Sequence, residues 1–92
     1  MTFKPTDVEQ FAIQAKLNMK VGSRVFDSLF LGMKIVGVLH GGMQVSVRSD
    51  HCAHVIERNY LGILAVIAES VLKKPIRSVT VVSRNVRDST DQ

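Results

Sequence analysis

The sequence predicts a single α+β domain in which two helices, a β-hairpin, a long helix and a last strand follow one another. Three observations predict this order. Thr6 and Glu9 form the pattern of a capping box at the start of an apolar repeat with helical spacing. A Gly-Gly pair at 41–42 separates two β-rich runs, which is a strong hairpin signal. A long apolar pattern over 51–72 then leads to a third β-rich run.

The N-terminal part of the chain is expected to form two helices. The first covers 7–19, and Gly22 ends it because glycine readily takes the positive φ angle of a helix terminator. A short second helix over 24–31 follows, with paired apolar residues one turn apart. Two short helices joined this tightly form a helical hairpin.

The remainder of the chain is expected to supply three strands and the longest helix. The strands cover 33–40, 43–48 and 76–83, and the second of them alternates strictly between apolar and polar residues. The helix covers 51–72, and Pro75 stops it. The resulting order is α-α-β-β-α-β, with a three-stranded sheet and the long helix packed across one face.

Length and composition favour one small domain in a reducing compartment. The chain has 92 residues, of which we assign 1–84 to the domain and 85–92 to a polar flexible tail. Its single cysteine, Cys52, excludes an intramolecular disulfide. No apolar run approaches the roughly 20 residues of a membrane helix, and the start lacks the pattern of a signal peptide. We therefore expect a cytoplasmic protein with no membrane partner.

The sequence contains no recognisable catalytic motif. A phosphate-binding loop, an H-E-x-x-H pair and a C-x-x-C pair are all missing. His51, Cys52 and His54 form the one cluster of metal-ligating types, but Cys52 falls on the apolar stripe of its helix and further ligands are lacking. We therefore expect no catalytic residue, no metal and no cofactor, so the chain is predicted not to be an enzyme.

The net charge of +4 is mild, and the twelve Lys and Arg residues are scattered rather than gathered into a stripe. Dedicated nucleic-acid binders usually concentrate such charge and place aromatic residues among it. The chain has no Trp and only one Tyr. This distribution favours an ordinary solvated surface over a nucleic-acid footprint.

Several segments together resemble the N-terminal domain, domain I, of the bacterial replication initiator DnaA. The segments are Gly22-x-x-Val25-Phe26-x-Ser28, Met43-Gln44-Val45-Ser46-Val47, Val55-Ile56-Glu57-Arg58-Asn59-Tyr60 with Leu61-x-x-Leu64, and Val79-Thr80-Val81. The resemblance covers about residues 8–83 and implies a KH-like fold, which agrees with the derived element order. It also implies a protein-interaction hub that self-associates, helps to bring the replicative helicase and binds regulators of initiation.

The resemblance places the partner-binding surface on the second helix and the start of the third. The residues that it implies there are Arg24, Val25, Leu29, His51, His54 and Arg58. The chain departs from the family at three of these positions. Val25 replaces an acidic or polar residue, Leu29 replaces a tryptophan, and His51 replaces an exposed aromatic residue. These departures put helicase recruitment in doubt while they leave the scaffold intact.

The sequence therefore favours a DnaA-related protein that regulates replication initiation by binding DnaA, a DnaA-related regulator or another replication protein such as the helicase. One alternative is a KH-like module with weak, salt-sensitive binding to single-stranded nucleic acid, although the GXXG loop of true KH domains is absent. Another is an excised domain I of a full DnaA, acting in helicase recruitment and self-association. A homodimer would pair through the helical hairpin, with the contact residues Val8, Phe11, Phe26 and Phe30.

Overall fold

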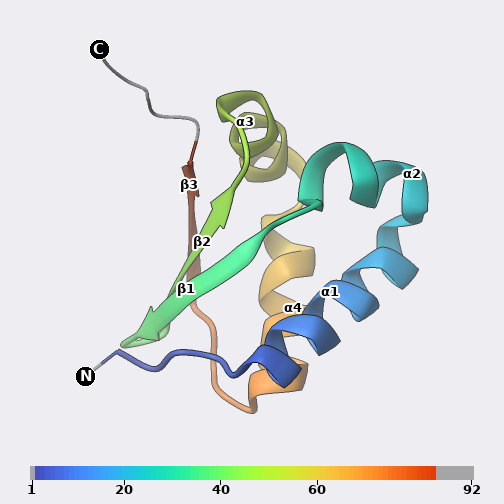
Figure 1. The fold of residues 1–92 in the computed structure, drawn as a ribbon. Helices are drawn as coiled ribbons and strands as arrows, with labels where there is room; N and C mark the ends of the chain where they lie inside the picture. Colours follow the sequence, from blue (N-terminus) through green and yellow to red (C-terminus); the bar gives the residue numbers. More distant parts are fainter. Residues whose placement is uncertain (1, 85–92) are drawn as a thin grey trace.

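A computed structural model describes residues 2–84, and the expected tail over 85–92 lies outside the described residues. The α+β class, the three-stranded sheet and the broad order of elements are confirmed (Figure 1). The elements in chain order are α1 (Asp7–Val21), α2 (Ser23–Val25), the π-helical turn η1 (Phe26–Phe30), β1 (Lys34–Leu39), β2 (Gly42–Val47), α3 (Asp50–Asn59), α4 (Leu61–Leu72) and β3 (Ser78–Ser83).

The first helix begins as the capping box predicts. The Thr6 hydroxyl accepts a hydrogen bond from the Glu9 amide at 3.1 Å, and the Glu9 carboxylate accepts one from the Thr6 amide at 2.8 Å. These bonds satisfy amides that would otherwise lack partners at the start of α1. The helix extends two residues further than predicted, to Val21, and Gly22 ends it with φ at 91°.

The prediction of one regular helix over 24–31 is wrong in its detail. Three residues form α2, and η1 continues from them with the wider hydrogen-bonding pattern of a π-helix. Three side chains of η1 are buried: Phe26, Leu29 and Phe30. Their spacing of three and four residues places them on one face of the turn.

The prediction of one long helix over 51–72 is also wrong. Tyr60 leaves the helical conformation, with φ at −128° and ψ at 5°, and divides the segment into α3 and α4. The Tyr60 ring packs edge-on against Phe30, with 5.4 Å between the ring centroids. The break allows α3 to lie against η1 while α4 packs along α1.

The sheet has the strand order β1-β2-β3, with β1 antiparallel to β2 and β3 parallel to β2. The hairpin turn centres on His40 and Gly41, which both have positive φ, so Gly42 already belongs to β2. A bulge between Ile35 and Gly37 shifts the register of β1.

The helices lie on one face of the sheet, as predicted (Figure 1). The core fills the space between them, and its largest fully buried side chains are Phe30, Ile13, Leu17, Met33, Met43, Ile56, Leu64, Val45 and Val47. Within residues 2–84, no helix has the length and apolar character needed to cross a membrane.

Side chains of α1 close the outer edge of β1. The Gln10 amide group donates to the Ile35 carbonyl at 2.8 Å, and its oxygen accepts from the Ile35 amide at 3.0 Å. Gln14 donates to the Met33 carbonyl at 3.0 Å. Further along the strand, the backbone of Phe3 exchanges two hydrogen bonds with Val38, at 2.8 and 2.9 Å. The edge of β1 is therefore satisfied by the chain itself.

Replacing Gln10 tests the importance of this closure. Gln10→Ala should lower the free energy of unfolding by about 1–3 kcal/mol, because the part-buried Ile35 amide and carbonyl both lose their partner. Gln44 is exposed on β2, so Gln44→Ala is the matched control and should change the free energy by about 0.5 kcal/mol or less. Urea unfolding followed by circular dichroism measures both values, and equal losses would contradict the assigned role of Gln10.

Candidate protein interface

Helix α3 presents three of the predicted partner-binding side chains to solvent, two near its start and Arg58 in its last turn. The Ser49 hydroxyl caps the helix by accepting from the Cys52 amide at 3.2 Å. His51, His54 and Arg58 are exposed and follow one another at spacings of three and four residues. Such spacings place side chains on the same side of a helix. The opposite side of α3 faces the core.

Two contacts hold η1 beside the start of α3. The Cys52 thiol donates to the Ser28 carbonyl, with 3.5 Å between sulfur and oxygen. The Arg48 guanidinium, from the loop before α3, donates to the carbonyls of both Asp27 and Ser28, the former at 2.9 Å. Side-chain donors of Arg48 and Cys52 therefore satisfy two backbone carbonyls of η1. The two elements that the resemblance selected, η1 and the start of α3, lie side by side.

The second-helix residues of the predicted surface do not all reach solvent. Arg24 is exposed, and Val25 is half-buried against the core. Leu29 is only 9% exposed and belongs to the core cluster, so its assignment to the partner-binding surface is wrong for the described fold. Leu29 lies three residues after Phe26 and one before Phe30, so it shares their buried face.

The interface residues that remain are Arg24, His51, His54 and Arg58, with Val25 at the edge. Charged side chains of both signs surround them, and Asp27 and Glu57 are exposed on the same two elements. None of these charged groups forms an ion pair within residues 2–84. Unpaired charges of this kind can attract a partner of complementary charge and guide its approach. They favour a polar contact over a purely apolar one.

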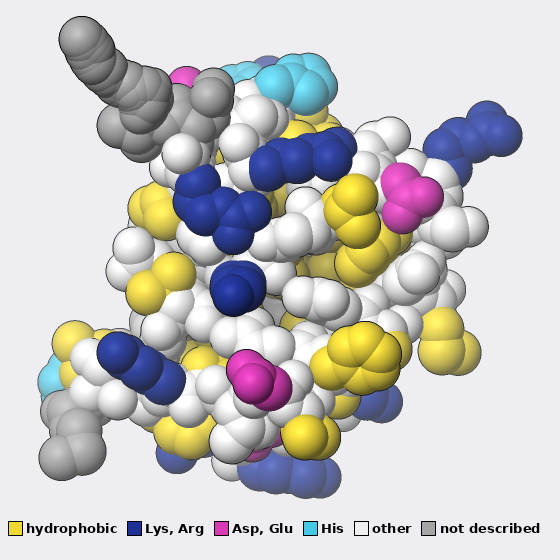
Figure 2. Space-filling model, viewed as in Figure 1, with side chains coloured by type: hydrophobic (Ala, Val, Ile, Leu, Met, Phe, Trp, Pro, Cys, Tyr) yellow, Lys and Arg dark blue, Asp and Glu magenta, His cyan; other side chains and the backbone are white. Residues whose placement is uncertain are grey.

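The residues predicted for self-association separate into a surface pair and a core pair. Val8 and Phe11 are 79% and 75% exposed, and Met19, which the sequence reasoning missed, is also exposed on α1. Hydrophobic side chains gather over this helix in Figure 2. Phe30 is fully buried and Phe26 nearly so, which makes their assignment to a self-association surface wrong. Their rings stack in the core instead, with 6.3 Å between the centroids.

Phe26 nevertheless reaches the floor of a small hollow beside Phe11. The hollow has a volume of 240 Å³ and is also lined by Gln14, Ala15 and Asn18 of α1. Phe11 and Phe26, which the sequence analysis placed in one self-association set, therefore both line this hollow, although only Phe11 is exposed. Their common hollow gives the exposed side of α1 a depression that an apolar side chain could enter.

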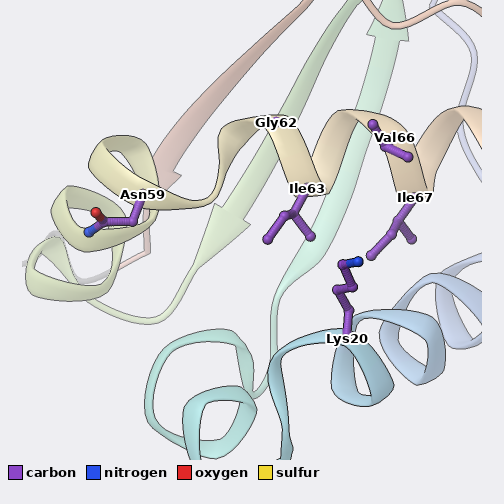
Figure 3. A pocket seen from close by; sticks show the side chains of 6 residues that line it. All are labelled: Lys20, Asn59, Gly62, Ile63, Val66 and Ile67. Atoms are coloured by element: carbon purple, nitrogen blue, oxygen red, sulfur yellow. The ribbon is translucent and has the colours of Figure 1, made fainter.

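A larger groove lies between the end of α1 and the start of α4 (Figure 3). Its volume is 560 Å³, and its lining residues are Lys20, Asn59, Gly62, Ile63, Val66 and Ile67. Ile63 and Ile67 point from α4 toward α1, and Lys20 reaches across to them. The groove exists because the break at Tyr60 sets α4 beside α1, and no sequence pattern signalled it.

The cluster of potential metal ligands does not converge. Cys52 is 3% exposed and directed into the fold, whereas His51 and His54 are exposed. Within the described residues, no group of three or more His, Cys, Asp and Glu side chains is placed to hold a metal ion. The absence of catalytic residues, metals and cofactors stays a prediction from the sequence.

No protein-family model matches the chain, and no curated protein matches it. The chain's own residues and their geometry are therefore the basis of the functional proposal below.

Two phenylalanine substitutions distinguish the core residues from the surface residues of the predicted self-association set. Phe30→Ala should lower the free energy of unfolding by about 3–5 kcal/mol, because it opens a cavity in the packed core. Phe11→Ala, on the exposed side of α1, should cost about 0.5 kcal/mol or less. Urea unfolding at a concentration where the protein is monomeric gives both values, and similar losses would show that the two rings are not placed as described.

Proposed function

We propose that this domain is a non-catalytic protein-interaction module that regulates the initiation of chromosomal replication. Its partner is DnaA, a DnaA-related regulator or another replication protein such as the helicase. The cellular setting and the choice of partners rest on the resemblance to DnaA domain I. The binding surface combines α2, η1 and the start of α3.

The observation that carries the proposal is the direct contact between η1 and the start of α3. The resemblance selected these two elements separately, and the Cys52–Ser28 and Arg48–Ser28 hydrogen bonds hold them side by side. Arg24 of α2 and Arg58 in the last turn of α3 are exposed, and arginine is enriched among the residues that dominate binding energy at interfaces. Because Leu29 is buried, the contact is expected to be more polar than one centred on an exposed aromatic residue.

Charge reversal at the two arginines tests this surface. The purified domain should bind DnaA, the replicative helicase or a DnaA-related regulator from the same bacterium in biolayer interferometry. Arg24→Glu combined with Arg58→Glu should weaken that binding about tenfold or more, because two exposed cations on the surface become anions. Lys4→Glu is the control, since Lys4 is exposed in the segment before α1 and should leave the affinity unchanged.

Two outcomes would contradict the proposal. The first is that none of the three replication proteins binds at micromolar concentration. The second is that the double variant binds as tightly as the unmodified domain. A single-stranded oligothymidine, assayed at two salt concentrations, provides the competing explanation. Salt-sensitive binding to this DNA without binding to any replication protein would favour the nucleic-acid alternative.

We further propose that α1 mediates self-association through its exposed apolar side. Val8, Phe11 and Met19 lie along this side. Acidic residues occupy the first turn of α1, and Lys20 lies in its last turn. An antiparallel pairing of two copies would set these opposite charges against each other at both ends of the contact. A two-fold arrangement of this kind is self-complementary, which is the requirement for a closed dimer.

The concentration dependence of the molar mass tests the role of α1. Sedimentation velocity should show the mass of the unmodified chain rising above 10.2 kDa as concentration increases. Phe11→Ser combined with Met19→Ser should keep the chain monomeric, because it removes two of the three large, exposed apolar side chains of α1. Val66→Ser is the control for loss of an exposed apolar residue on another helix. Self-association that persists unchanged in the double variant would rule out this surface.

A further inference from the structure

The groove between the end of α1 and the start of α4 has apolar walls. Ile63, Val66 and Ile67 supply them from successive turns of α4 (Figure 3). Ile67 is buried, Ile63 is half-buried and Val66 is 66% exposed, so the apolar lining runs from the core out to the surface. The volume of 560 Å³ lies within the range of about 300–1,000 Å³ that is usual for pockets that bind small molecules.

A single cation without a partner lies at this groove. The Lys20 side chain extends from α1 toward Ile67 (Figure 3). Its ammonium group forms no ion pair or hydrogen bond within residues 2–84. No acidic residue is among the described residues that line the groove, and the other polar side chain there, Asn59, donates its amide nitrogen to the Val55 carbonyl at 3.2 Å. The groove therefore combines an apolar surface with one uncompensated positive charge.

Gly62 leaves one wall of the groove without a side chain. It is not among the glycines with a positive φ angle. A β-carbon added to it would meet no heavy atom from another part of the fold within 4 Å. Neither the backbone conformation nor the packing of the described residues thus requires glycine here, although glycine is less favourable than alanine in a helix. The open space beside Gly62 lets an outside group approach the backbone of α4 closely.

We propose that this groove binds a small amphiphilic carboxylate, a molecule with one aliphatic chain and one negative charge. The chain lies against Ile63, Val66 and Ile67 and passes close to Gly62, and the carboxylate pairs with the ammonium group of Lys20. Burial of the chain supplies most of the affinity, whereas the charge-assisted contact fixes the orientation of the ligand. The site requires neither a replication partner nor self-association.

Titration of the full chain with sodium octanoate, followed by nuclear magnetic resonance, tests the site at a concentration where the chain is monomeric. The methyl signals of Ile63, Val66 and Ile67 should shift saturably, whereas those of Val8, which is exposed on α1 outside the groove, should not. Octanol has the same chain without the charge and should bind about threefold more weakly or worse. Octylammonium, which carries the opposite charge, should bind about tenfold more weakly or worse.

A series of butanoate, hexanoate and octanoate examines the apolar part of the groove. The affinity should rise about tenfold with each added pair of methylene groups, because each pair removes further apolar surface from water. Equal affinity for the three acids would show that only an adventitious anion is held near Lys20, and it would contradict the proposed role of the apolar walls.

Replacing Lys20 examines the charge separately. Lys20→Met keeps a long side chain over the groove and removes the ammonium group. It should weaken octanoate binding about threefold or more and leave octanol binding unchanged. Lys4→Met, at an exposed position before α1, is the matched control and should leave the affinity for both ligands unchanged.

Filling the groove examines its shape. Gly62→Leu places a side chain in the open space of the wall and should weaken octanoate and octanol alike, by about tenfold or more. It should not lower the free energy of unfolding, since leucine favours a helix more than glycine does. His54→Leu adds the same side chain to an exposed helical position outside the groove and should leave the affinity unchanged. Circular dichroism verifies that each variant is folded.

Several outcomes would overturn the proposal. Octanoate could produce no saturable shift, or octylammonium could bind as tightly as octanoate. Lys20→Met or Gly62→Leu could keep full affinity for octanoate. The shifted signals could belong to the hollow beside Phe11 instead of the groove. Failure of the replication proteins to bind α2, η1 and α3 would contradict the proposed function and leave these results unaffected.

Discussion

The double hydrogen bond between Gln10 and Ile35 joins the first helix to the edge of the sheet. One side chain imitates the backbone of a neighbouring strand and satisfies both polar groups of Ile35. It thereby fixes α1 against the edge of β1 while α4 packs along another side of the same helix. The apolar side of α1 that carries Phe11 is left facing solvent. At the same time the chain's own groups occupy the outer edge of β1, whereas β3 pairs with β2 alone among the described strands.

The break at Tyr60 has an equally wide effect. It turns one continuous apolar segment into two helices that pack on different partners, α3 on η1 and α4 on α1. The first contact joins the elements of the proposed replication interface. The second creates the groove that contains Lys20 and exposes Val66. Both the proposed replication interface and this groove thus depend on how the helices are divided at Tyr60.

The sequence predicted the helices and strands well where interactions between residues close in the chain determine them. The Thr6–Glu9 capping box and the glycines of the hairpin turn act within a few residues, so α1 and the β1–β2 pair were anticipated. The division at Tyr60 was missed because it depends on packing against Phe30, which is distant in sequence. Leu29 was assigned to the surface by the resemblance, although its spacing from Phe26 and Phe30 places it on their buried face. In the candidate site, the exposure of His51, His54 and Arg58 follows from helical spacing, whereas the adjacency of η1 and α3 required the tertiary fold.

The central claim is that the chain closes the β1 edge of its own sheet, whereas the Val79 and Val81 amides on β3 have no hydrogen-bond partner among the described residues. Hydrogen–deuterium exchange of individual amides, followed by nuclear magnetic resonance, tests it directly. The Ile35 and Val38 amides should be protected to nearly the level of the core, and the Thr80 amide should be protected by its bond to β2. The Val79 and Val81 amides should exchange at least about tenfold faster than these three. Equal protection along both edges would contradict the account.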